Sequence, residues 1–86
     1  MESYRILVRE SAVGELERLP KKDLSRVIRR IQGLAAQPRP GGSEKLSAQE
    51  RYRVRQGDYR IVYAVDDGGR TVEVVKIGHR SEIYRR

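Results

Sequence analysis

The chain has 86 residues, which predicts one small domain spanning residues 1–86 and excludes a multidomain enzyme. Nineteen Lys and Arg against twelve Asp and Glu leave a formal net charge of +7, which favours a polyanionic partner such as nucleic acid, an acidic protein or an anionic surface. With no Cys and one His, disulfides and thiolate metal sites are excluded, and we expect neither a metal ion nor another cofactor.

The first part of the chain predicts a strand followed by two helices. Residues 4–9 form a short β-prone run. Ser11 is then expected to cap a helix that ends at Pro20. Residues 21–37 carry the strongest helical pattern, a continuous apolar stripe of Leu24, Val27, Ile28, Ile31, Leu34 and Ala35. Because the break at residues 19–20 is short, we expect an antiparallel helical hairpin.

The second part of the chain changes to a period of two, which predicts strands. Residues 51–55 and 58–65 alternate as a hairpin, with Gln56 and Gly57 as the expected two-residue turn. Residues 71–77 are apolar on both faces and predict an interior strand, and a turn with a short helical tail is expected after Gly78. The predicted fold is therefore α+β, in the order β-α-α-β-β-β, with an antiparallel sheet and the helical hairpin on one face.

The expected hairpin separates an apolar face from an arginine face. With Gln56 and Gly57 as the turn, Arg53 lies directly opposite Arg60, a like-charge pair that costs stability. The predicted arginine face carries Arg51, Arg53, Arg55 and Arg60. The other face of the hairpin carries the core residues Tyr52, Val54, Tyr59, Ile61 and Tyr63. The arginine side chains either spread into solvent over an open sheet face or converge on a phosphate through paired hydrogen bonds. The net charge of the chain favours the phosphate site.

Other features of the sequence are less specific. There is no phosphate-binding glycine loop, zinc-ligand spacing or acidic cluster of a two-metal nuclease. His79 is better explained as a surface or turn residue than as a catalyst, whereas Tyr84 is equally explained as a core residue. The cations of the second helix form a solvated face or an auxiliary contact with a nucleic-acid backbone. The candidates for nucleic-acid contact are Arg55, Lys76, Lys21, Lys22, Arg26, Arg29 and Arg30.

Two motifs, R-x-R-x-G-D-Y-R-I-V-Y at residues 53–63 and G-H-R-x-x-I-Y at residues 78–84, resemble the RelE/ParE toxins of bacterial toxin–antitoxin pairs. The resemblance covers essentially the whole chain and is closer to the RelE branch. It implies a metal-independent endoribonuclease that cleaves messenger RNA in the ribosomal decoding site by attack of the 2′-hydroxyl on the adjacent phosphate. Carried over by motif position, its catalytic residues are Arg51, Arg53, Arg60, Arg80 and Tyr84.

The resemblance leaves the proton acceptor open. RelE-like enzymes often have lysines where this chain has Arg51 and Arg53, and an arginine stays protonated. Tyr84 is the first candidate acceptor, followed by His79 and then by Glu50 or Lys45.

The resemblance also implies an acidic antitoxin partner and contact with operator DNA only through the toxin–antitoxin complex. The alternatives are a ParE-like gyrase inhibitor and an inactive toxin that acts as a co-repressor. No apolar run approaches a membrane span of roughly 20 residues and the first residues lack a signal-peptide core, so we expect a cytoplasmic protein that makes no membrane contact.

Overall fold

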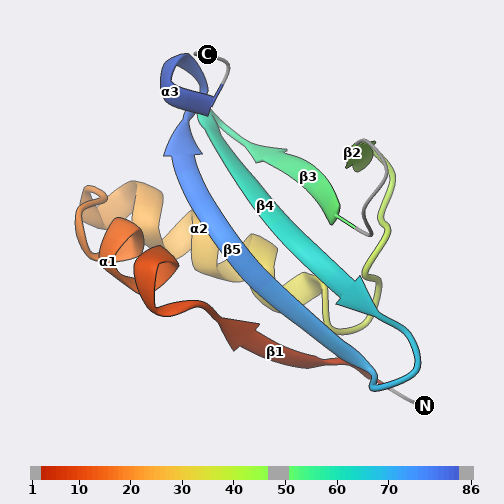
Figure 1. Ribbon diagram of the computed structural model, residues 1–86. Helices are drawn as coiled ribbons and strands as arrows, with labels where there is room; N and C mark the ends of the chain where they lie inside the picture. Colours follow the sequence, from red (N-terminus) through yellow and green to blue (C-terminus); the bar gives the residue numbers. More distant parts are fainter. Residues whose placement is uncertain (1–2, 47–50, 84–86) are drawn as a thin grey trace.

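The computed structural model of the chain describes residues 3–46 and 51–83 (Figure 1). Its elements are β1 (Arg5–Val8), α1 (Glu10–Glu17), α2 (Lys21–Gly33), β2 (Glu44–Leu46), β3 (Arg51–Gln56), β4 (Tyr59–Asp66), β5 (Thr71–His79) and α3 (Arg80–Ile83). The predicted α+β order is confirmed, with one short strand, β2, added before the hairpin.

The sheet is mixed rather than purely antiparallel. Its strand order is β1-β5-β4-β3-β2, and the meander of β3, β4 and β5 is antiparallel as predicted. β1 instead pairs in parallel with β5, a strand from the other end of the chain. No tight turn joins these two strands, so local sequence does not specify their relative direction. β5 is an interior strand, as its two apolar faces predict.

The helices α1 and α2 cover one face of the sheet (Figure 1). Ala12 of α1 and Val27 and Ile31 of α2 are buried, and they share one core with the sheet residues Tyr52, Val54, Ile61, Tyr63, Val65, Val72, Val74 and Ile77. The predicted core side of the hairpin is therefore confirmed, with Tyr59 partly buried against it.

Two helix boundaries differ from the prediction. α1 begins at Glu10 directly after β1, because the carbonyl of Arg9 accepts the N–H groups of Ala12 and Val13 while its own N–H still bonds Val74. Ser11 therefore lies inside the helix and does not cap it. α2 ends at Gly33 rather than at residue 37, and Leu34 remains buried in the turn that follows.

The β3–β4 turn is shifted by one residue from the prediction. Gly57 and Asp58 form the turn, with Gly57 at φ +61°, as a two-residue hairpin with glycine in its first central position requires. Every cross-strand partner moves by two residues as a result. A shift of two keeps each side chain on its predicted face, so only the partners change.

A group of hydrogen bonds joins the α2–β2 connection and the β4–β5 turn to β3 and to the segment before β1, at the end of the sheet away from this turn. Arg39, in the α2–β2 connection, donates to both carboxylate oxygens of Asp67 at 3.2 and 2.9 Å and to the Tyr52 hydroxyl at 2.9 Å. The Tyr4 hydroxyl also donates to Asp67, at 2.6 Å. These bonds, from Arg39 first and Tyr4 second, hold the pKa of Asp67 below its ordinary value.

Replacing Asp67 with Asn is expected to make stability less dependent on pH. A carboxylate whose pKa is lowered by folding stabilises the protein above its unfolded pKa, and this contribution is lost as pH falls through the folded value. Asp67→Asn should therefore lower the melting temperature by a few degrees at neutral pH, and the difference from wild type should shrink in acid. Glu17→Gln, on an exposed helix position, is the control for the loss of one negative charge. A deficit of equal size at every pH would contradict the account.

Candidate functional site

The arginine face consists of Arg51, Arg53 and Arg55 of β3 and Arg60 of β4. Their neighbours in each strand are buried against the helices, so strand alternation places these four on the opposite side of the sheet. Arg55 is exposed, whereas Arg60 is only 5% exposed. The sequence therefore predicts the membership of this face correctly.

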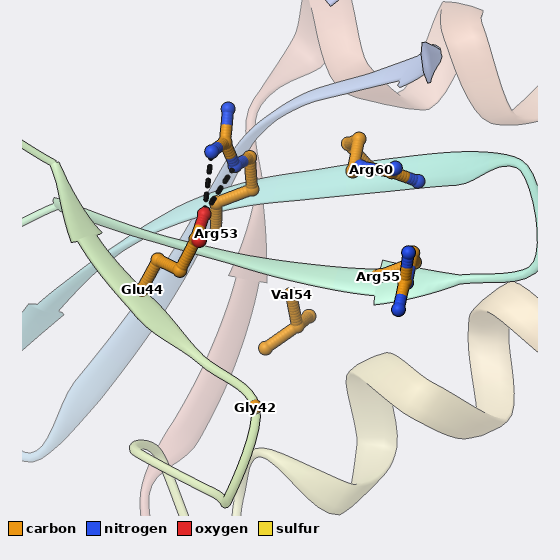
Figure 2. Close-up of a pocket in the computed structure, with 6 residues that line it drawn as sticks. All are labelled: Gly42, Glu44, Arg53, Val54, Arg55 and Arg60. Carbon is orange, nitrogen blue, oxygen red and sulfur yellow. Dashed lines mark hydrogen bonds and ion pairs between the residues drawn. The ribbon is translucent and has the colours of Figure 1, made fainter.

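A cavity of about 180 Å³ opens where β2 meets β3 (Figure 2). It is lined by Gly42, Glu44, Arg53, Val54, Arg55 and Arg60. Figure 2 shows the three arginines projecting from two paired strands, with the Glu44 carboxylate bound to one of them. Three guanidinium groups and one carboxylate at a single cavity form a site suited to a phosphate.

The like-charge pair at this cavity differs from the predicted one. Arg55 lies opposite Arg60, and Arg53 lies opposite Val62, because of the shifted turn. The predicted Arg53–Arg60 pairing is wrong, although both residues line the cavity.

Glu44 is the site residue that the sequence did not reveal. It pairs with Arg53 across β2 and β3, and its carboxylate accepts hydrogen bonds from the Arg53 Nε at 3.1 Å and from Nη2. These hydrogen bonds, then the charge of Arg53 and lesser effects of Arg60 and Arg55, hold the pKa of Glu44 below its ordinary value. The only signal in the sequence is the charge complementarity of Glu44 and Arg53, which becomes visible once β2 is known.

Several predicted site residues lie away from the cavity. His79 pairs with Tyr59 on the helix side of the sheet, and the two rings meet edge to face at 5.7 Å. The Lys76 Nζ reaches Glu15 of α1 at 3.3 Å. Lys45 follows Glu44 in β2, so alternation directs it to the other face of the strand.

The C-terminal candidates are placed only in part. The Arg80 backbone N–H donates to the Asp58 carbonyl at 2.7 Å, which anchors the start of α3 at the β3–β4 turn. Arg80 is thereby brought to the end of the sheet where Arg55 and Arg60 lie. Glu50 and Tyr84 fall outside the described residues, and their roles stay predictions.

The five cations of α2 separate into two groups. Lys21 and Lys22 are exposed in the first turn. Arg26, Arg29 and Arg30 line a second cavity of about 390 Å³ together with Gly33 and Gln56. This second cavity lies on the helix side of β3, because Gln56 alternates with Arg55.

Within residues 3–46 and 51–83, no group of three or more His, Cys, Asp or Glu residues could hold a metal ion. In the same part of the chain, no helix is long and apolar enough to cross a membrane.

Comparison with known proteins identifies the family. The family described as the ParE toxin of type II toxin–antitoxin system, parDE, matches residues 6–84. The chain belongs to this family of toxins. It is 36% identical over 84 residues to Toxin RelE of Mycobacterium tuberculosis, covering 95% of this chain and 87% of that protein. Toxin RelG of the same organism is 32% identical over 85 residues, with 96% and 98% covered.

Solved RelE structures share the fold of this toxin. The RelBE2 toxin–antitoxin complex of M. tuberculosis superposes with a TM-score of 0.80 at 26% identity, covering 91% of this chain and 99% of that one. The archaeal RelE–RelB complex from Pyrococcus horikoshii gives a TM-score of 0.78 at 26% identity, with 90% and 94% covered. The resemblance to RelE-type toxins predicted from the two motifs is thus confirmed.

Replacing Arg55 with Gln is expected to leave folding stability unchanged or to raise it. The substitution removes the like charge opposite Arg60, and such a pair destabilises a sheet by about 0.2–1 kcal/mol. Arg5→Gln is the matched control, because Arg5 is an exposed strand arginine that lies opposite Thr71. The measurement is urea unfolding of the three proteins. A marked loss of stability in Arg55→Gln alone would show that this arginine supports the fold.

Proposed function

We propose that this toxin is a ribosome-dependent, metal-independent endoribonuclease that cleaves messenger RNA and thereby arrests translation. The observation that carries the proposal is the cavity lined by Arg53, Arg55 and Arg60, where the Glu44 carboxylate is bound to Arg53. Its relatives are named RelE and RelG, and its fold is that of solved RelE toxins. The cavity is small, so the proposal assigns the positioning of the message to the ribosome.

The proposed reaction is an internal transesterification. The 2′-oxygen forms a bond to the adjacent phosphorus, the bond from phosphorus to the 5′-oxygen breaks, and the products carry a 2′,3′-cyclic phosphate and a 5′-hydroxyl. Negative charge accumulates on the phosphorane oxygens in between. Arg53, Arg55 and Arg60 are assigned to stabilise that charge, with Arg51 and Arg80 as further cations.

Proton transfer in this reaction needs groups other than arginine. Glu44 is assigned to accept the 2′-hydroxyl proton, because it lines the cavity and its carboxylate is ionised at neutral pH, while arginine stays protonated. In the bound state, a phosphate replaces the carboxylate on the Arg53 guanidinium, which frees Glu44 to act as the base. Tyr84 is assigned to donate a proton to the departing 5′-oxygen.

Glu44→Gln is expected to slow single-turnover cleavage on ribosomes by about 10²- to 10⁴-fold, the usual loss for a general base. In the wild type, the rate should fall with decreasing pH as the Glu44 carboxylate released from Arg53 becomes protonated, and the variant should lose this acid limb. Glu73→Gln is the control, because Glu73 is also paired with an arginine, Arg9, but does not line the cavity. If Glu44→Gln cleaves slowly with an unchanged acid limb, Glu44 only positions Arg53, and another group accepts the proton.

The proposal includes an acidic antitoxin. Related RelE toxins have been solved in complexes named for RelB antitoxins. A net charge of +7 and an arginine-lined cavity suit a partner whose acidic segment covers the arginine face. Operator DNA is expected to be contacted only by the toxin–antitoxin complex.

The family description names ParE, which supports gyrase inhibition as a second candidate function. One comparison separates the two: purified toxin is added to ribosomes programmed with a defined message and, separately, to gyrase in a supercoiling assay. Our proposal expects cuts in the message that end in 2′,3′-cyclic phosphate, with supercoiling unaffected. Intact message together with inhibited gyrase would overturn it. An inactive co-repressor would leave both substrates unchanged.

A further inference from the structure

The second cavity, which we call the α2 arginine cavity, has no role in the chemistry above. Arg26, Arg29 and Arg30 stand at positions i, i+3 and i+4 of α2 and therefore share one side of the helix. They line a cavity of about 390 Å³ with Gly33 and Gln56, and no acidic residue contributes to its lining. Cations so spaced repel one another, so their grouping favours an anion between them.

The Nε–H group of Arg30 is a hydrogen-bond donor that the fold does not use. Its Nε is buried, yet it has no hydrogen-bond partner among the described residues. Buried donors in folded proteins are almost always paired. None of the three cavity arginines forms an ion pair within the described part of the chain. The cavity therefore offers guanidinium groups to an acceptor from outside the chain.

The α2 arginine cavity lies across β3 from the proposed cleavage site. Gln56 lines one cavity, and its neighbour Arg55 lines the other on the opposite face of the same strand end. β2 pairs with β3 only from Arg51 to Arg53, so no described strand covers this end of β3. A polyanion can therefore reach both cavities around an open strand edge.

We propose that the α2 arginine cavity is a second phosphate site, which binds the backbone of RNA while the arginine face acts on the message. An RNA chain is favoured over a single carboxylate side chain as the ligand. Successive phosphates of one RNA chain can place a negative charge in each of the two cavities, whereas one carboxylate can occupy only one of them. Arginine forks also bind phosphate through paired hydrogen bonds. This inference rests on the proposed function, because it takes RNA as the polyanion.

The test compares two double variants of the same helix. Arg26→Gln/Arg29→Gln removes two cavity cations, and Lys21→Gln/Lys22→Gln removes two exposed cations outside the cavity. Binding is measured from 50 to 200 mM KCl to isolated small ribosomal subunits and to a twelve-nucleotide single strand protected by 2′-O-methyl groups. These two probes distinguish ribosomal RNA from message as the source of the phosphate.

The cavity variant should lose about tenfold or more in affinity for at least one probe, whereas the lysine variant should lose much less. Its plot of log affinity against log salt should become shallower by roughly 0.7 to 0.9 per lost phosphate contact. On programmed ribosomes, its KM should rise while kcat stays unchanged. In the wild type, the Arg30 Nε–Hε resonance should shift when RNA is added.

Equal losses in the two double variants would overturn the proposal, because they would indicate general charge attraction. Unchanged RNA affinity in a cavity variant that no longer binds the acidic antitoxin would assign the cavity to protein instead. Failure of the proposed function is distinguishable, since wild type would then leave the message intact while the two variants still differed in RNA affinity. Circular dichroism and melting temperature establish that each variant is folded.

Discussion

The structure depends on the register of the β3–β4 hairpin, which the Gly57–Asp58 turn sets. In this register Tyr52, Val54, Ile61 and Tyr63 all face the helices and close the core, while the intervening arginines face the other way. A slip of one residue would exchange the two faces and bury guanidinium groups under α2. Hydrophobic burial on one face therefore holds the cations of the other face in place without requiring any attraction between them.

The arginines at the two ends of the sheet have different partners. At the end near Tyr4, Arg39 donates hydrogen bonds to Asp67 and Tyr52, and these bonds connect the α2–β2 connection to the β4–β5 turn and to β3. At the hairpin end, Arg55 and Arg60 lie opposite each other, and the Glu44 carboxylate forms an ion pair with Arg53. A carboxylate on one of several guanidinium groups resembles the charge pattern of a bound phosphate, and a phosphate can displace it. The same side chain is then available as a base, which links the resting structure to the proposed chemistry.

Much of this arrangement could be predicted from sequence because it follows from periodicity. The stripe of α2 and the alternation of β3 and β4 fixed the core side and the arginine face. The Arg53–Arg60 pairing was wrong because turns at Gln56–Gly57 and Gly57–Asp58 preserve the same faces, so the pattern cannot distinguish them. Glu44 and the parallel pairing of β1 depend on contacts between distant segments, which no local pattern encodes. The position of His79 beside Tyr59, on the helix side of the sheet, also depends on long-range pairing, because the pairing of β4 with β5 is irregular between Val62 and Tyr63.

The central claim is that the arginine face receives the phosphate of a message held by the ribosome. The most direct measurement is the structure of the toxin on a ribosome whose message carries a 2′-O-methyl group at the cleavage position, which blocks the attack. The account predicts a backbone phosphate within hydrogen-bonding distance of the Arg53 and Arg60 guanidinium groups, with the Glu44 carboxylate displaced from Arg53 toward the 2′-oxygen. A message that contacts another surface, with the ion pair of Glu44 and Arg53 intact, would contradict it.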